Sequence, residues 1–444
     1  MVKTSGRWSD AAVACFLAVL LALVVAPRQA QAGEAHLLYV ARAAKDRNGF
    51  RTLKPSLEVF DIDNGHKLVR VIPLEAPPGT APVFAIRGIT ASAATHRLYI
   101  SHYGSYRELR RGGPLSGHVL CLDLETGKVL WNRAYAASVD RGAVTPDGTK
   151  LFMPSGELST TSYFYVIDAA SGEEDAGQRI PVAPYPHNTV ITPDGSRVFM
   201  TAFGGFDSGQ YEPYIRVADT RTGEVVQKIG PFAAHVRPIT VNGAGTLVFA
   251  CVNKLLGFQV GDVRTGTVLF TAQAPADQFP PPEGNAVVSH GISMTADEKE
   301  VWVVDQARPG VHVFDVSGLP GSAPVWKSYI PTHRGREKDE KGQPLYGEEN
   351  GIIGPPGWIM SSIDGKYFYP ESGEIIDTGA KKIVGQLIGA NGRYLHSRFG
   401  LEVVFDGNRV VGVGDQQGVG RGTDRLPGRS DGDVGGSNLP DGTG

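Results

Sequence analysis

Charged and titratable side chains recur at one position of a repeated sequence unit, at intervals of about 50 residues. When the units are aligned on their turns, that position holds Arg87, Asp140, His187, Arg237, His290 and Gly357. The next position holds Gly88, Arg141, Asn188, Pro238, Gly291 and Trp358. Guanidinium groups bind anions, imidazoles transfer protons near neutral pH, and imidazoles together with carboxylates bind metal ions. One place in the repeat therefore offers three kinds of chemistry.

Eight of these residues are the predicted ligand-binding set: Arg87, Asp140, Arg141, His187, Asn188, Arg237, His290 and Trp358. Metal binding is the weakest of the three interpretations, because the histidines come from different repeats and no H-x-H or H-E-x-x-H spacing occurs. No serine nucleophile elbow between a strand and a helix is recognisable, and there is no C-x-x-C-H haem motif. We therefore predict no metal and no cofactor. A polar ring that only satisfies its own hydrogen bonds is the competing interpretation.

The elements that must position this set are short strands joined by two kinds of turn. Residues 187–223 hold a complete copy: a strand over 190–192, the turn Pro193-Asp194-Gly195, a strand over 197–202 and a strand over 214–218. The second turn begins with aspartate and usually ends with glycine. It recurs seven times, starting at Asp61, Asp123, Asp168, Asp219, Asp262, Asp315 and Asp377.

Successive copies lie 43 to 62 residues apart, near or above the spacing typical of propeller blades. Four short antiparallel strands cannot bury both faces alone, whereas seven such sheets packed around an axis can. We predict an all-β, seven-bladed β-propeller over residues 33–417, followed by a disordered Gly/Asp-rich tail over 418–444. Six blades run from about residue 86 to 389.

The seventh blade must be shared between the chain ends. Its candidate strands are 37–42, 57–62 and 68–72 from the N-terminal side, and 401–405 and 409–413 from the C-terminal side. That is one strand more than a four-stranded blade requires, and the pattern leaves the sharing open. Pairing of the two ends would close the ring without a covalent bond.

The turn pattern and the second strands, which read Leu98-Tyr99-Ile100, Val198-Phe199-Met200 and Val301-Trp302-Val303, resemble the YVTN β-propeller repeat family over about residues 37–416. That family overlaps the lactonase-like seven-bladed propellers. The resemblance implies the fold, and as an alternative function it implies hydrolysis of a lactone or related ester. In that case His187 or His290 would be the general base, and Arg87 or Arg237 would hold the developing oxyanion.

Hairpin geometry predicts which face of the disc carries the site. The first strand begins, and the second strand ends, on the same face, which also receives the long connections 74–86, 103–117, 203–212, 272–289 and 331–356. Second-strand ends add His102, Tyr103, Glu157, Asn253, Lys254, Asp305, Gln306 and Glu371. Long loops on a rigid scaffold commonly carry binding residues. Two further segments lie on this face. The basic, aromatic loop at 103–111 could bind an acidic partner and the mixed-charge stretch 333–349 could form a flap beside the channel; a solvated loop is the alternative interpretation of each.

Residues 1–32 have the pattern of a secretory signal, with basic Lys3 and Arg7, an apolar run over 11–26 and a small-residue site at Ala30-Gln31-Ala32. Without this leader, 40 basic and 45 acidic residues remain from 43 and 46, a net charge of −5. That balance disfavours nucleic acid as a partner. Only Cys121 and Cys251 follow the leader, and we expect two lone buried thiols.

The sequence therefore predicts an exported protein, periplasmic or extracellular, without a membrane span and monomeric. It would bind a small molecule or an extracytoplasmic protein on the loop-bearing face, and the pattern favours binding over catalysis without deciding between them.

Overall fold

The computed structural model describes residues 33–42, 54–109, 116–205, 211–280, 287–333, 338–343, 345 and 357–421. The predicted leader, much of the loop 331–356 and the chain from 422 onward fall outside this set. Within it, no helix is long and apolar enough to cross a membrane. All described residues except Gly33 belong to one unit, which is built from β-sheets.

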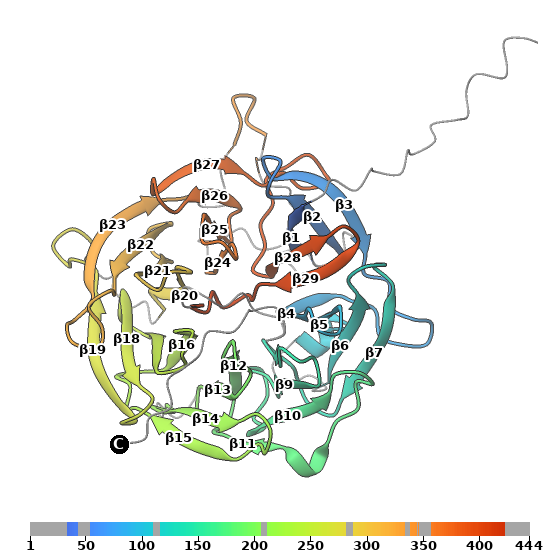
Figure 1. The fold of residues 1–444 in the computed structure, drawn as a ribbon, viewed down its shortest axis with the longest axis horizontal. Helices are drawn as coiled ribbons and strands as arrows, with labels where there is room; N and C mark the ends of the chain where they lie inside the picture. The colour runs from blue at the N-terminus through green and yellow to red at the C-terminus, as the bar shows by residue number, and fades with distance from the viewer. Residues whose placement is uncertain are drawn as a thin grey trace, which may run out of the picture. The chain divides into compact units, whose positions relative to one another are not determined.

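Seven antiparallel sheets surround a central axis, which confirms the predicted seven-bladed propeller (Figure 1). Six of the sheets are continuous in sequence and have four strands each. The first three contain β4 (Ala85–Ser92), β5 (Arg97–Tyr103), β6 (Gly117–Asp123) and β7 (Val129–Tyr135); β8 (Ala143–Val144), β9 (Lys150–Pro154), β10 (Tyr163–Asp168) and β11 (Ile180–Pro181); and β12 (Pro186–Ile191), β13 (Arg197–Ala202), β14 (Ile215–Asp219) and β15 (Val225–Ile229).

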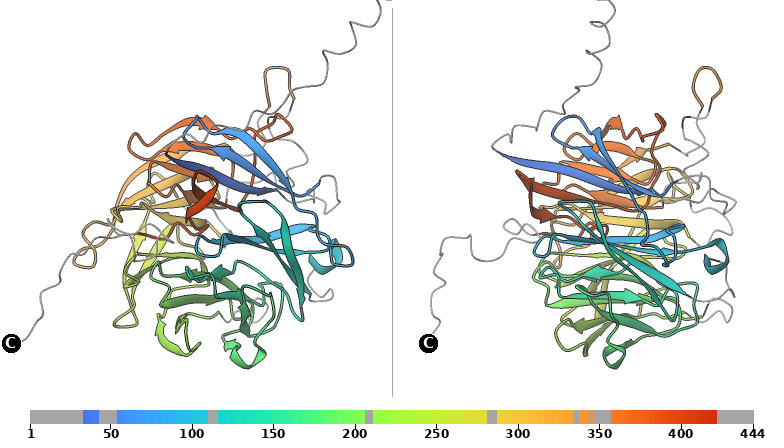
Figure 2. Two further views of the ribbon diagram at one scale, coloured as in Figure 1. Left: turned by 45° about the vertical axis from the view of Figure 1, so that its right-hand side comes forward. Right: turned by 90° about the vertical axis from the view of Figure 1, so that its right-hand side faces the viewer.

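The next three contain β16 (Val236–Val241), β17 (Leu247–Val252), β18 (Gly257–Asp262) and β19 (Thr267–Gln273); β20 (Ser289–Met294), β21 (Glu300–Asp305), β22 (Gly310–Asp315) and β23 (Val325–Pro331); and β24 (Ile359–Ser361), β25 (Tyr367–Pro370), β26 (Glu374–Asp377) and β27 (Lys382–Gln386). Two single-turn helices, α1 (Tyr106–Leu109) and η1 (Ala176–Gln178), lie in connections. Figure 2 shows the disc from its edge, with α1 on one face.

The seventh sheet joins the two ends of the chain in the order β29-β28-β1-β2-β3. Its strands are β1 (Glu34–Arg42), β2 (Ser56–Asp61), β3 (Lys67–Pro73), β28 (Gly400–Asp406) and β29 (Arg409–Val413). The clasp is the β1–β28 pair, in which Leu37 lies opposite Val403 and Tyr39 opposite Leu401. All five predicted strands therefore belong to this blade. Because β28 contacts both β24 and β4, it corresponds to the first strand of the other blades. The fifth strand, β29, pairs with the remaining edge of β28.

The two repeated turns form for the reasons that their residues suggest. In the first turn, Gly148 has a positive φ of 70°, and the Asp147 carboxylate accepts a hydrogen bond from the backbone N–H of Thr149. In the degenerate copy that lacks glycine, Glu298 adopts the same region with a φ of 60°. Local turn chemistry therefore sets the repeat, and apolar side chains fill the space between neighbouring blades. Trp302 and Phe368, for example, stack across such a boundary with ring centroids 4.2 Å apart.

Beyond β29, the chain crosses the channel. The carbonyl oxygen of Gly418 accepts hydrogen bonds from the Met294 N–H and the Thr240 hydroxyl, both at 2.8 Å. The Gly420 N–H donates to Val241, and the buried Arg421 donates to the Ile363 carbonyl at 2.7 Å. The packed chain therefore extends through Arg421, four residues past the predicted boundary at 417, and the rest of the predicted tail lies outside the described residues.

Candidate functional site

Several predicted site residues stand on bulges near the beginning of innermost strands. In β4, β12, β16 and β20 the pairing with the neighbouring strand slips by one residue. The slipped positions contain Arg87, His187, Asn188, Arg237 and His290. A bulge redirects side chains out of the regular alternation of a strand. Together with Asp140, Arg141, Glu157 and Trp358, we call these residues the mouth cluster.

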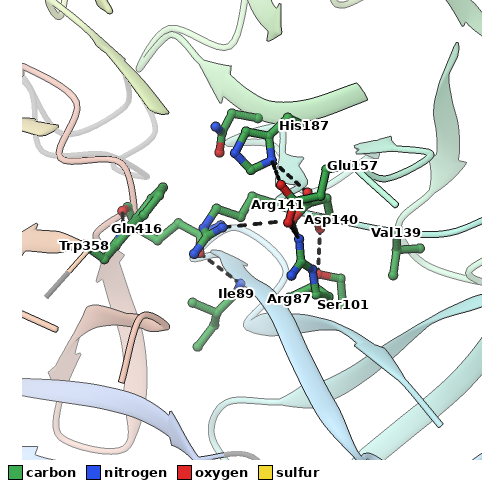
Figure 3. A network of polar contacts seen from close by, with 12 residues as sticks. Arg87, Ile89, Ser101, Val139, Asp140, Arg141, Glu157, His187, Trp358 and Gln416 are labelled. Carbon is green, nitrogen blue, oxygen red and sulfur yellow. Dashed lines mark hydrogen bonds and ion pairs between the residues drawn. The ribbon is translucent and has the colours of Figure 1, made fainter. Parts of the chain in front are cut away.

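Two carboxylates, one guanidinium and one imidazole form the centre of the mouth cluster (Figure 3). Arg87 Nη2 lies 3.0 Å from Asp140 Oδ1 and also donates to Glu157. His187 Nδ1 lies 2.8 Å from Asp140 Oδ2 and 3.6 Å from Glu157 Oε2. Asp140 is fully buried and His187 is 1% exposed. Three residues from the predicted position, in three consecutive repeats, are thus brought into direct contact.

The backbone around Asp140 is fixed from two sides. The Ser101 hydroxyl donates to the Asp140 carbonyl at 2.7 Å, and the Tyr103 hydroxyl donates to the Val139 carbonyl at 3.2 Å. Gly88 permits the close approach of this segment, because a Cβ there would lie 2.9 Å from Arg141 Cα. Burial raises the pKa of Tyr103 to about 12, so its hydroxyl stays protonated and able to donate.

Arg141 extends from the carboxylates toward Trp358 (Figure 3). Its guanidinium carbon lies 3.8 Å from the ring centre of Trp358 and 5.2 Å from that of Phe399. Its Nη1 is 4.0 Å from Asp140 Oδ1, at the outer limit of an ion pair. The Trp358 indole is itself held, because its N–H donates to the Gln416 carbonyl of the crossing segment at 2.7 Å.

His290 and Arg237 complete the cluster without entering its central ion pairs. His290 Nδ1 donates to the Gly357 carbonyl at 2.7 Å, and its ring centre lies 6.5 Å from that of His187. Arg237 donates to Asn253 and lies over the Phe203 ring at 4.8 Å. Phe203 also contacts the His187 ring, with centroids 4.6 Å apart. All eight predicted binding residues therefore lie around one end of the channel.

The protonation states follow from burial and neighbouring charges. Burial would raise the pKa of Glu157, but Arg87 and His187 hold that pKa well below its usual value. Burial lowers the pKa of His290 far below its usual value, and the charge of Arg398 lowers it further. A neutral histidine with so low a pKa is a weak base. The low pKa of His290 argues against it as the base, and the geometry favours His187, whose Nδ1 is oriented by Asp140.

Several buried polar atoms of the mouth cluster have no hydrogen-bond partner in the described part of the chain. They are Arg87 Nε, His187 Nε2, both polar atoms of the Asn188 side-chain amide, and Nε and Nη2 of Arg141. Asn188 is fully buried, and its backbone bridges that of Arg141. Each buried polar group without a partner costs roughly 1–3 kcal/mol, and such groups are rare in folded proteins. This concentration of unpaired groups is the main functional signal of the molecule.

A cavity lies further along the channel, between the mouth cluster and the first turns at Pro146 and Pro193. The residues that follow Arg141 and Asn188, namely Gly142 and Thr189, line a space of about 80 Å³ together with the crossing segment 414–417. At about 30 Å³ per molecule in liquid water, this volume has room for a small group of waters. Solvent or a small polar group can thus lie in the channel beyond the cluster, against the crossing segment.

Three residues with metal-ligand side chains also converge here, since donor atoms of Asp140, Glu157 and His187 lie within 4.8 Å of one another. Arg87 bonds to both carboxylates, and His187 Nδ1 faces them. A guanidinium thus already supplies the positive charge that a metal ion would bring. The arrangement fits an ion-pair network better than a metal centre.

Two of the predicted rim residues, His102 and Asp305, do not join the cluster. His102 bonds to Asn132 and stacks on His118, whereas Asp305 accepts from the backbone of Ala307 and pairs with His312. These side chains lie between strands of their own blades. The loop residues Arg110 and Arg111 and most of the stretch 333–349 fall outside the described residues.

Sequence reasoning missed three residues that shape the site: Phe203, Gln416 and Arg398. Phe203 sits one residue past β13, and Arg398 pairs with Glu371, another predicted rim residue, at 2.7 Å. Gln416 comes from the crossing segment, where no repeat provides an alignment. Its signal, a pair of glutamines after the last strand, is too common to indicate a site.

No family model matches the chain, and no curated protein matches it.

Proposed function

We propose that the mouth cluster binds a small molecule at the loop-bearing end of the channel, in an exported protein as the pattern of residues 1–32 predicts. The observation that carries this proposal is the Asn188 amide, which is fully buried with neither its oxygen nor its nitrogen paired among the described residues. A ligand with a donor and an acceptor would satisfy both atoms. β-propellers commonly serve as binding platforms, which supports the assignment only at the level of the fold.

The decisive experiment compares Asn188→Leu with Asn132→Leu in the mature protein. Asn132 is a buried amide with complete partners, because its nitrogen donates to Thr80 and Ala81 and its oxygen bonds to His102. Asn188→Leu should leave stability unchanged or raise it, and should abolish binding of whichever compound in a small-molecule panel raises the melting temperature. Asn132→Leu should lower stability and leave binding intact.

Loss of stability in Asn188→Leu with unchanged ligand affinity would assign the amide a structural role and contradict the proposal. A panel in which no compound shifts the melting temperature, combined with no bound compound in native mass spectra of the purified protein, would do the same.

A second candidate function is hydrolysis of a lactone or ester, and the Asp140–His187 pair supports it. A carboxylate that accepts from Nδ1 leaves Nε2 as a proton acceptor, the orientation of a general base. The resemblance to YVTN repeats points the same way. Proton release from a lactone panel, lost in a His187→Ala/His290→Ala variant of unchanged melting temperature, would establish the activity. No release by the wild-type protein would exclude it for those substrates.

A further inference from the structure

We propose that the ligand of the mouth cluster carries a carboxylate, and that Arg141 binds this group through the Nε–Nη2 edge of its guanidinium. The inference rests on the proposed function and adds the chemical class of the ligand. It is carried by the state of Arg141, whose contacts differ from those of the other arginines around the site.

The contacts of Arg141 leave one edge of its guanidinium unused. Trp358 covers one face at 3.8 Å, and Nη1 is directed toward Asp140 at 4.0 Å. Nε and Nη2 are both buried and have no partner in the described chain. In a guanidinium these two nitrogens share an edge, and their parallel N–H groups match the two oxygens of a carboxylate. The stacked indole would hold the fork in plane while it binds.

The charges of the site leave room for one anion. Four guanidinium groups, those of Arg87, Arg141, Arg237 and Arg398, and three carboxylates, those of Asp140, Glu157 and Glu371, lie around the site, a balance of 4 − 3 = +1 from these seven side chains. Arg87 forms ion pairs with Asp140 and Glu157, and Arg398 forms one with Glu371. A monoanion neutralises this excess charge, whereas a phosphate dianion would reverse its sign.

The electrostatics of Arg141 agree with this geometry. Burial lowers the pKa of Arg141 to about 9, and the attraction of Asp140 is opposed by the nearby charges of Arg87 and Arg398. A cation that is buried without a close counter-ion is costly. A ligand carboxylate on the free edge would provide that counter-ion and restore the pKa toward its usual value.

Asn188 narrows the class further. Its backbone forms a bridge with that of Arg141, so the unpaired amide and the unpaired guanidinium edge come from adjacent backbone positions of two neighbouring blades. A hydroxyl or carbonyl beside the carboxylate would bond to the amide. We therefore infer a small hydroxy- or oxo-carboxylate. Because both groups are buried, neighbouring side chains must move to admit it, as they often do at binding sites.

The test is calorimetric titration of the full chain with a matched panel: small 2-hydroxy- and 2-oxocarboxylates, their neutral amides, and inorganic phosphate. A carboxylate should bind at least about 100-fold more tightly than its amide, because the amide leaves the guanidinium unpaired. Arg141→Met should weaken carboxylate binding by about 100-fold. Arg141→Lys, which keeps the charge and loses the fork, should weaken it by about 10-fold.

Arg179→Met is the control, because Arg179 also stacks on an aromatic ring, that of Tyr163 at 4.3 Å, and pairs with Glu174 outside the mouth cluster. It should leave affinity unchanged. Equal binding of carboxylate and amide, or carboxylate binding that survives both Arg141 variants, would overturn the carboxylate assignment while the proposed function stands. Tighter binding of phosphate would replace the ligand class. If nothing in this panel binds while another compound binds in an Asn188-dependent way, only the ligand class falls; if nothing binds at all, both proposals fall.

Discussion

Among the described residues are two buried aspartate–histidine pairs that differ in how completely their hydrogen bonds are satisfied. In the pair between β21 and β22, His312 Nε2 lies 3.3 Å from Asp305 Oδ2, and its Nδ1 accepts from the Trp326 indole at 3.1 Å. In the mouth cluster, His187 Nδ1 bonds to Asp140, and its Nε2 has no partner among the described residues. Both histidines are 1% exposed.

Equal burial and equal residue types therefore do not give equal roles. Every polar atom of the His312 ring is paired, and Phe279 and Tyr329 pack against it with centroids 4.7 and 4.9 Å away. Such a pair contributes to stability by completing a core. The pair at the mouth carries an unpaired nitrogen that only an added group can satisfy. The contrast suggests that unpaired buried atoms, rather than residue types, mark the functional pair.

The largest expected effect comes from replacing each histidine by phenylalanine, which keeps a ring of similar shape. His312→Phe removes the hydrogen-bond partners of Asp305 Oδ2 and of the Trp326 N–H, while Asp305 Oδ1 keeps the backbone N–H groups of Ala307 and Arg308. We expect a loss of about 3 kcal/mol in the free energy of unfolding. His187→Phe leaves Asp140 paired with Arg87, and the loss should stay below about 1.5 kcal/mol. Urea denaturation measures both values. Equal losses would break the comparison between the two pairs.

Ligand affinity provides the second half of that comparison. His187→Phe should abolish binding of the carboxylate or any other panel ligand, whereas His312→Phe should not alter it at a temperature where the variant remains folded. A binding defect in both variants would mean that the two pairs are coupled.

The low pKa of a third buried histidine, His102, should make the stability of the protein depend on pH. His102 has an amide partner, Asn132, at 3.0 Å, and burial lowers its pKa to about 4. Its unfolded pKa is about 6.5, so between these values the unfolded chain binds the extra proton and stability falls as pH falls. His102→Gln keeps the donor and removes the titration. Between pH 6.5 and 4.5, wild type should lose about 2–3 kcal/mol more than the variant.

The variant also serves as the control for other titrating groups. The carboxylates titrate in both proteins, so their contributions cancel in the difference between the two free energies of unfolding. Parallel pH profiles for His102→Gln and wild type would show that the histidine opens to solvent before it is protonated.

A smaller effect is expected from Gly291→Ala, which tests whether the mouth cluster is held rigidly. An added Cβ would lie 2.7 Å from Trp358 Cα and 2.9 Å from its carbonyl carbon, so the backbone beneath Arg141 must shift. Overpacking of this kind costs about 1–2 kcal/mol. Gly412→Ala on β29 is the matched control, since its Cβ would meet Val404 side-chain atoms at ordinary contact distance, 3.4 Å. If both variants denature at the same urea concentration and bind ligand alike, the close approach does not position the site.

Much of this architecture is predictable because it depends on local rules. Turn glycines and aspartates recur in sequence, and antiparallel hairpins place Arg87, Asp140 and His187 at the same end of the channel. The orientation of these side chains is not predictable, because each bulge shifts the alternation by one residue and nothing in the residue types signals a bulge.

The crossing segment shows the second limit. Composition groups residues 418–421 with the Gly-rich tail, yet backbone hydrogen bonds to Met294 and Val241 hold the segment in the channel. Backbone groups are the same in every sequence, so no side-chain pattern announces this path. For the same reason the contact between Trp358 and Gln416 could not be predicted.

The smallest expected effect concerns a histidine–carboxylate pair at the clasp, where the pH dependence has the opposite sign to that of His102. His36 Nδ1 on β1 bonds to Glu402 on β28, and this bond raises the pKa of His36 above its usual value. The folded state therefore holds the proton more tightly than the unfolded state. The resulting stability is fully present below pH of about 6.5 and is lost as pH rises through the folded pKa. His36 is partly exposed, so solvent limits the contribution to about 0.5–1 kcal/mol.

His36→Gln should be less stable than wild type by that amount at pH 5.5 and equally stable near pH 8.5, as measured by urea denaturation. A stability difference that is constant across this pH range would mean that the clasp depends on a hydrogen bond from a neutral imidazole. His36 would then resemble His312, whose contribution comes from hydrogen bonding.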